Sequence, residues 1–239
     1  MTFKVDSRIF EKFPDVRIGY IFVTGIDNSQ PENNNLIKRI TEESQKIRKE
    51  LSIDTVSALP YVSRWRAIYK EFGAKPSDYR SSIENLTRMI LKGRDLSHIN
   101  TLVDIYNYIS LKYKLPIGGE DVDKMQGNLE LSIATGEEPI TELLGDNNPE
   151  RPFKGEILYK DEAGVICRCW NWREAARTIL SKKTRNAVLV VETTSKEEYE
   201  LLEKAIDGMA ALVTHFVGGK LVRGYLTSNS PLVTFNEPK

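Results

Sequence analysis

The chain has 239 residues, of which 40% are hydrophobic and 28% charged, and its formal net charge is zero. A chain of this length buries about 70–75% of its unfolded surface on folding, so neither disulfides nor a structural metal are needed for stability. The balanced charge also disfavours a non-specific duplex-binding protein, because such proteins carry a strongly basic domain.

Charge is nevertheless unevenly distributed along the chain. Residues 1–119 hold 19 Lys and Arg against 14 Asp and Glu, whereas residues 120–239 hold 15 against 20. This leaves room for a local basic surface that meets one structured RNA. The two cysteines, Cys167 and Cys169, lack C-x-x-C spacing and a second Cys/His pair, so no metal or cofactor is expected.

No apolar run approaches the ~20 residues that a membrane-spanning helix needs. The first 14 residues alternate charges with three phenylalanines and lack the continuous apolar stretch of a signal peptide. We therefore expect no membrane association and a cytoplasmic location.

The first half of the chain is predicted to be mainly helical. Periodicity, proline and glycine signals indicate, in chain order, a strand over 17–25 and helices over 36–51, 61–72, 76–91 and 99–113. Pro76 is placed at the first turn of its helix, a position that proline tolerates. The pair Gly118-Gly119 is interpreted as following the last of these helices, where glycine is typical of a cap.

After residue 120 the hydrophobic period changes to that of strands. The predicted elements are strands over 128–134, 156–159 and 165–170, a central strand over 186–192, a helix over 195–216 and a last strand over 221–226. Ser195 and Glu198 are predicted to form a capping box at the start of the helix. This order favours an α+β fold, a mixed or antiparallel sheet with packed helices, rather than a doubly wound one. We predict a single domain over 1–239, with its helical N-terminal part in 1–95.

No phosphate-binding loop or nucleophile elbow is present, and no serine stands out as a nucleophile. The segment Arg168–Arg185 is the most suggestive for RNA, because it combines six basic residues with Trp170 and Trp172. Five cations in it are predicted to bind RNA: Arg168, Arg173, Lys182, Lys183 and Arg185. The alternative, that the tryptophans fill the core and the cations coat a solvated segment, stays equally open.

One stretch, HINTLVDIYNYISLKYKLPIGG at 98–119, carries a family pattern. Its Ile99-Asn100, Asn107-Tyr108 and Pro116 resemble those of the tRNA-editing (B3/4) domain of the phenylalanyl-tRNA synthetase beta subunit. The resemblance covers about residues 80–195 and includes an apolar strand that ends in Glu192. The flanking segments look like those of free-standing versions of this domain.

The resemblance implies a fold of the editing-domain type and a pocket that removes wrongly attached tyrosine from tRNA. Asn107 and Glu192 would hold the aminoacyl group, and Glu192 would read the tyrosine hydroxyl. Such a carboxylate rejects a substrate that lacks the hydroxyl, because the carboxylate is then left unpaired. The implied partner is tRNA or aminoacyl-tRNA, and the implied activity is deacylation of mischarged tRNA in trans.

Three departures from the family pattern change the expected pocket. Gly118 stands where the family has a histidine, Tyr106 stands where threonine is common, and 169–172 (CWNW) replaces a small glycine-rich turn. The substrate-binding set is therefore Asn107, Glu192, Tyr106 and Gly118, with no catalytic residue assigned. The alternative is a non-catalytic module that binds RNA or a free amino acid in the same pocket.

Overall fold

The computed structural model describes residues 1–145 and 149–235. The helices are α1 (Ser7–Lys12), α2 (Asn34–Glu50), η1 (Val56–Ala58), α3 (Pro60–Glu71), α4 (Ser82–Leu91), α5 (Thr101–Tyr113), η2 (Val122–Lys124), η3 (Lys196–Glu198) and α6 (Tyr199–Phe216). The strands are β1 (Thr2–Val5), β2 (Arg17–Thr24), β3 (Ile117–Asp121), β4 (Leu129–Ile133), β5 (Ile157–Asp161), β6 (Gly164–Arg168), β7 (Arg173–Glu174), β8 (Asn186–Thr193), β9 (Lys220–Leu226) and β10 (Leu232–Thr234).

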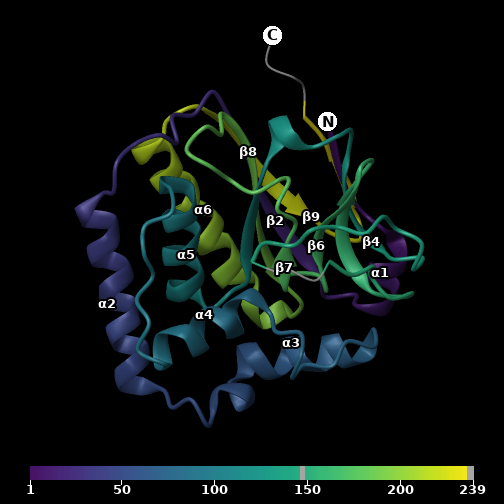
Figure 1. Cartoon of the computed structure of the whole chain (residues 1–239), viewed down its shortest axis with the longest axis horizontal. Helices are drawn as coiled ribbons and strands as arrows, with labels where there is room; N and C mark the ends of the chain where they lie inside the picture. Colours follow the sequence, from purple (N-terminus) through teal and green to yellow (C-terminus); the bar gives the residue numbers. More distant parts are fainter. Residues whose placement is uncertain (146–148, 236–239) are drawn as a thin grey trace.

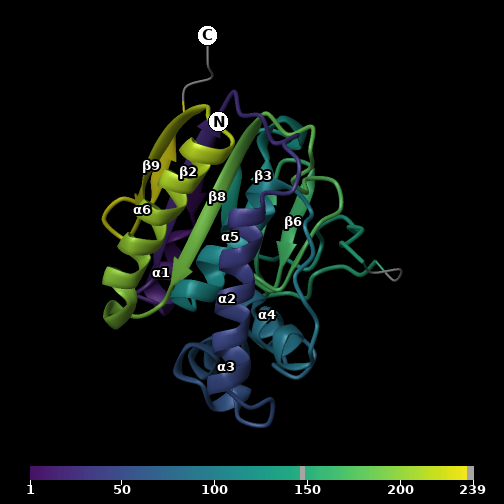
Figure 2. The ribbon, with the colours of Figure 1, turned by 90° about the vertical axis from the view of Figure 1, so that its left-hand side faces the viewer.

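These elements form three layers: helices, a four-stranded sheet and a six-stranded sheet. The four-stranded sheet has the order β3-β8-β2-β9, and the six-stranded sheet has the order β10-β1-β4-β5-β6-β7. Helices α2, α5 and α6 lie on the outer side of the four-stranded sheet, and the six-stranded sheet lies on its other side (Figure 1). The view turned by 90° shows α6, α5 and α2 in front of the strands (Figure 2). The layers confirm the predicted α+β class.

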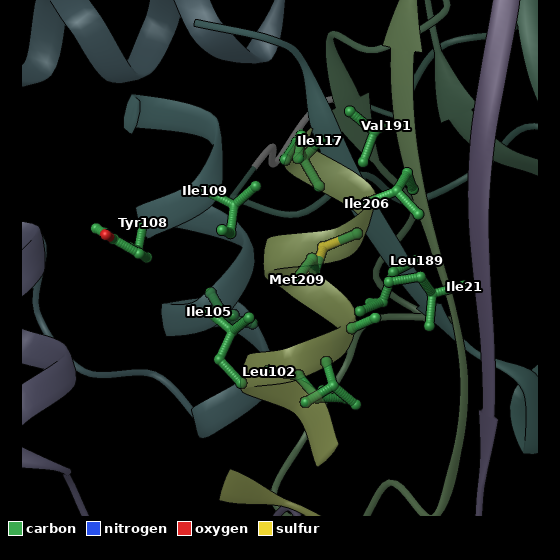
Figure 3. Close-up of a cluster of buried hydrophobic side chains, with 14 of the residues drawn as sticks. Ile21, Leu102, Ile105, Tyr108, Ile109, Ile117, Leu189, Val191, Ile206 and Met209 are labelled. Carbon is green, nitrogen blue, oxygen red and sulfur yellow. The ribbon is translucent and has the colours of Figure 1, made fainter. Parts of the chain in front are cut away.

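Two hydrophobic clusters join the layers. The first packs α5 and α6 onto the four-stranded sheet, with Ile105 and Met209 from the helices meeting Ile21 and Leu189 from the strands (Figure 3). The second lies between the two sheets and includes Phe3, Tyr159 and Trp170. The strand β8 therefore has apolar neighbours on both faces, as its nearly continuous apolar sequence predicts.

The six-stranded sheet is mixed, because β1 runs parallel to β4 whereas its other pairs are antiparallel. The strands β1 and β10 and the helix α1 were not predicted from the sequence. Their formation depends on long-range pairing: Phe3 lies opposite both Leu129 of β4 and Val233 of β10. Such short segments have little periodicity of their own from which a strand could be recognised.

Three predictions on local structure are wrong. The helix placed at 76–91 begins at Ser82, because the Ser81 side chain caps it by accepting the Glu84 amide. The pair Gly118-Gly119 lies inside β3, and the αL residue that ends α5 is Lys114. The Ser195 hydroxyl accepts the amide of Glu197, so a short 3₁₀ turn precedes α6 in place of the capping box.

Candidate functional site: a cavity between the two sheets

A cavity of about 250 Å³ opens where α4 and α5 meet the strands of both sheets. Leu86 and Met89 of α4 and Val188 and Val190 of β8 supply apolar walls. All four predicted substrate-binding residues line this cavity. They are Tyr106, Asn107, Gly118 and Glu192.

Asn107 lies on the second turn of α5 and is half-buried. The helix is fixed at its start by Asn100, whose side-chain oxygen accepts the Val103 amide. Within residues 1–145 and 149–235, the Asn107 side chain has no hydrogen-bond partner and does not cap a neighbouring backbone group. Its amide is therefore available to a ligand in the cavity, as both donor and acceptor.

Glu192 lies near the end of β8 and is 1% exposed. Its Oε1 accepts from the Tyr159 hydroxyl at 2.5 Å and from Trp170 Nε1 at 3.0 Å, and its Oε2 accepts from Asn171 Nδ2 at 2.6 Å. Burial raises the pKa of Glu192 to about 7, although these three donors oppose the shift. Since a carboxylate oxygen accepts about two hydrogen bonds, only Oε2 retains capacity for a ligand.

Two of the three donors to Glu192, Trp170 and Asn171, come from a strained turn after β6. Cys169 and Trp170 have φ angles of 45° and 64°, which are uncommon for residues with a Cβ. The Trp170 amide donates to the Ile157 carbonyl at 2.6 Å, and the Trp170 ring lies edge-on to Trp65 and Phe13. This surrounding structure holds the strained conformation, which directs the Trp170 indole and the Asn171 amide onto Glu192.

The partners Tyr159, Trp170 and Asn171 were not identified as site residues from the sequence. The only signal was the bulky 169–172 segment, noted as a departure from the family pattern. Their effect is that the hydroxyl of Tyr159 and the indole of Trp170 already occupy one carboxylate oxygen of Glu192.

Two further acids in the cavity were also missed: Glu120 of β3 and Glu174 of β7. Burial, followed by the negative charge of Glu174, raises the pKa of Glu120 well above its ordinary value. Burial raises the pKa of Glu174 to about 7, although a hydrogen bond with the backbone of Gly119 opposes the shift. The sequence offered no signal for Glu174, because β7 is only two residues long.

Gly118 and Gly119 differ sharply in the room around them, and this allows a matched pair of variants. A Cβ on Gly119 would lie 2.5 Å from Leu189 Cδ2, whereas a Cβ on Gly118 would find Glu174 Oε1 at 3.4 Å as its nearest neighbour. Gly119→Ala is expected to lower the free energy of unfolding by about 1–3 kcal/mol through overpacking. Gly118→Ala is expected to change it by less than about 1 kcal/mol. Urea unfolding followed by circular dichroism measures both, and equal losses would contradict the packing described.

The predicted RNA-binding cations separate into different environments. Arg168 is 2% exposed and is ion-paired to Glu156, so its assignment to an RNA surface is wrong. Arg173 is half-buried, lines the cavity and lies over the Trp172 ring. Trp170 is fully buried, so its ring fills the core, as the alternative interpretation of this segment predicts.

The other three cations, Lys182, Lys183 and Arg185, are exposed in the loop before β8. This loop lies at the start of β8, whereas Glu192 lies near its end. Glu192 lies six positions after Asn186 along the strand, which corresponds to a distance of about 20 Å. The structure therefore does not bring these cations to the Glu192 end of the cavity.

Within the described ranges, no three His, Cys, Asp or Glu side chains are arranged to hold a metal ion. In the same part of the chain, none of the helices has the length and apolar character to cross a membrane.

The two packed sheets and their helices, with Asn107 and Glu192 lining one cavity between the layers, define an α+β domain. The family model of the B3/4 domain matches residues 64–218. The chain belongs to this B3/4 domain family, and the resemblance noted in its sequence is confirmed at that level.

Two relatives are each described as a phenylalanine–tRNA ligase beta subunit. The one from Fusobacterium nucleatum is 34% identical over 77 residues, which are 32% of this chain and 9% of the relative. The one from Mycoplasma pneumoniae is 32% identical over 81 residues, which are 34% of this chain and 10% of the relative. The matches thus span about a tenth of the length of these relatives.

Among solved structures, an N-terminal fragment of the phenylalanyl-tRNA synthetase beta subunit from Pyrococcus horikoshii is similar. The comparison covers 93% of this chain and 53% of that chain, with a TM-score of 0.46 and 12% sequence identity.

Proposed function

We propose that this chain holds the aminoacyl group of a mischarged tRNA in the cavity and hydrolyses the ester in trans. The observation that carries the proposal is that Asn107 and Glu192, 85 positions apart in sequence, line one cavity. Membership of the B3/4 family and the relatives named as phenylalanine–tRNA ligase beta subunits support it. The free side-chain amide of Asn107 is the group best placed to orient the ester.

The chemistry requires positioning rather than a strong base. An ester held in a fixed orientation, with a water placed against its carbonyl, gains rate from proximity and from donors aimed at the developing oxyanion. In this chain Asn107 would hold the ester, and the apolar walls would take the amino-acid side chain. The terminal hydroxyl of the tRNA would help to place the water.

Selection by a side-chain hydroxyl would be weaker here than the family resemblance implies. Glu192 Oε1 already accepts from Tyr159 and Trp170, which leaves one acceptor position on Oε2. A hydroxylated side chain would therefore gain at most one hydrogen bond. The exposed cations Lys182, Lys183 and Arg185 would contact the tRNA backbone at a distance from the chemistry, as positioning contacts without sequence information.

The test is hydrolysis of a full panel of mischarged aminoacyl-tRNAs by the purified chain. At least one is expected to be deacylated, and Asn107→Ala is expected to lower kcat/KM about tenfold or more, because losing one hydrogen bond costs about 1.4 kcal/mol. Asn34→Ala, at an exposed position of α2, is the matched control and should be unchanged. A panel left intact would refute catalysis. Binding without turnover would then identify a non-catalytic RNA- or amino-acid-binding module.

A further inference from the structure

The polar lining of the cavity is strongly acidic. Three glutamates, Glu120, Glu174 and Glu192, face it from three different strands. Glu192 is satisfied by its three internal donors. Glu120, by contrast, is 7% exposed, and in the part of the chain that the structure describes its Oε2 is buried without a hydrogen-bond partner. The Thr178 side chain lies near enough to lower the pKa of Glu120, but among the described residues its hydroxyl is also left without a hydrogen bond of good geometry. An unpaired buried carboxyl oxygen is costly, so we look for its partner in a ligand.

The fold brings Glu120 and Glu174 to the same end of the cavity from different sheets. Gly118 and Glu120 share one face of β3, since side chains alternate along a strand. Glu174 lies in β7 of the other sheet, and its Oε1 is 3.4 Å from the place where a Cβ on Gly118 would stand. The charge of Glu174 acts on Glu120 and raises the pKa of that carboxyl. The two carboxyls are therefore close neighbours across the space that Gly118 leaves open.

The charge of Arg177 opposes the rise in the pKa of Glu120 but does not cancel it. Arg177 is committed to Asp161 through two hydrogen bonds of 2.8 and 2.6 Å, and it also donates to the carbonyls of Gly164 and Val165. Arg173 lies over the Trp172 ring. Among residues 1–145 and 149–235 no ion pair to the carboxyl of Glu120 or Glu174 is formed. Two such carboxyls suit a group that is both cationic and rich in donors, and a primary ammonium offers three N–H donors.

We propose that Glu120 and Glu174 form the subsite for the α-ammonium group of the ligand, so that the cavity takes amino acids whose carboxyl is esterified or amidated in preference to free amino acids. An esterified amino acid carries only the positive charge. A free amino acid also carries a carboxylate, which three glutamates would repel. This inference rests on the proposed function, since it assumes that an aminoacyl group occupies the cavity.

The experiment is calorimetric titration of the full chain at pH 7, where the α-amino group of an amino-acid amide (pKa about 7.7–8.0) is mostly protonated, with L-phenylalaninamide, L-leucinamide, L-methioninamide and L-tyrosinamide. Each amide is compared with its free amino acid and with its N-acetylated amide. At least one amide is expected to bind, and at least tenfold more tightly than both of its counterparts. Equal binding of the amide and its N-acetyl form, or no binding of any amide at millimolar concentration, would overturn the proposal.

Variants locate the subsite. Glu120→Gln and Glu174→Gln are each expected to weaken amide binding at least fivefold. Glu42→Gln is the control, because Glu42 is exposed on the helix α2 and does not line the cavity, and it should leave amide binding unchanged. Circular dichroism establishes that each variant is folded. Unchanged affinity in both cavity variants would refute the subsite.

The outcomes also separate this inference from the proposed function. Ammonium-dependent amide binding without hydrolysis of any aminoacyl-tRNA would retain the subsite and reject the catalytic activity. Hydrolysis that proceeds at the original kcat/KM in both Glu120→Gln and Glu174→Gln would retain the activity and reject the subsite.

Discussion

Glu156→Ala is expected to lower the free energy of unfolding by about 3–5 kcal/mol, the usual cost of removing one partner of a buried ion pair. Glu156 is 0% exposed, and both its oxygens are fully used. Oε1 accepts from Arg168 Nε at 2.6 Å and from the Cys169 amide at 2.8 Å, and Oε2 accepts from Arg168 Nη2 at 2.8 Å and from the Phe153 amide at 3.2 Å. Alanine would leave a buried guanidinium and two amides without these acceptors.

Urea unfolding at pH 7 measures the loss, with Lys182→Ala as the control. Lys182 is exposed in the loop before β8, so its truncation should change the free energy of unfolding by no more than about 0.5 kcal/mol. Arg168→Ala should also destabilise the chain, but less than Glu156→Ala, because the carboxylate would keep its two amide donors. If Glu156→Ala unfolds at the same urea concentration as the parent chain, this ion pair does not stabilise the fold.

The ion pair of Glu156 with Arg168 also supports the geometry of the cavity. By accepting the Cys169 amide, Glu156 holds the first residue of the strained turn whose next two residues donate to Glu192. We therefore expect Glu156→Ala, where it remains folded, to weaken ligand binding as well. The pair links the stability of the six-stranded sheet to the geometry of the site.

Elements with a clear period of their own could be predicted from sequence. The α5 helix and the β8 strand were found within a few residues, because one carries a helical apolar face and the other a nearly continuous apolar run. These two elements carry Asn107 and Glu192, and both residues line the cavity. Their role in substrate binding stays a prediction. The extent of the chain as one domain stays a prediction.

What the sequence did not show depends on contacts between distant segments. The strand β3 contains two glycines and two acids, poor β-formers, and it exists because it pairs with β8 from Ile117↔Val191 to Asp121↔Ala187. Arg168 was placed on an RNA surface because the charge pattern alone cannot reveal a buried partner 12 residues earlier. The internal donors to Glu192 were missed for the same reason, since Tyr159 lies 33 positions away.

The free energy of unfolding is expected to fall as the pH rises from about 5 to 8, by about 2–5 kcal/mol. Burial raises the pKa values of Glu174 and Glu192 to about 7, and the pKa of Glu120 is also raised. Between their ordinary pKa of about 4.3 and these raised values, the unfolded chain releases protons that the folded chain keeps. The stability that these groups contribute is therefore complete below about pH 4.5 and is lost as the pH rises through about 7.

Carboxyls with the opposite shift act outside this window. Hydrogen bonds and charge from Arg177 lower the pKa of Asp161 despite burial, and Arg8 lowers that of Asp6. Their contribution is present above their ordinary pKa values and is lost only as the pH falls below about 4. Burial also raises the pKa of Asp104, which lies outside the cavity, so the slope between pH 5 and 8 reports the cavity acids together with Asp104. The Glu174→Gln variant isolates the share of one cavity acid.

Urea unfolding at pH 5.5 and pH 8, at matched ionic strength, measures this slope. Glu174→Gln should stabilise the chain at pH 8 relative to the parent, by about 1–3 kcal/mol after allowing for its partial exposure, and by about half as much at pH 5.5, which lies between the unfolded and folded pKa values. The exposed Glu42→Gln should leave the slope unchanged. A parent chain that is equally stable or more stable at pH 8 would contradict the raised pKa values. A stabilised Glu174→Gln that has also lost amide binding would show that the acidic lining is kept for its ligand at a cost in stability.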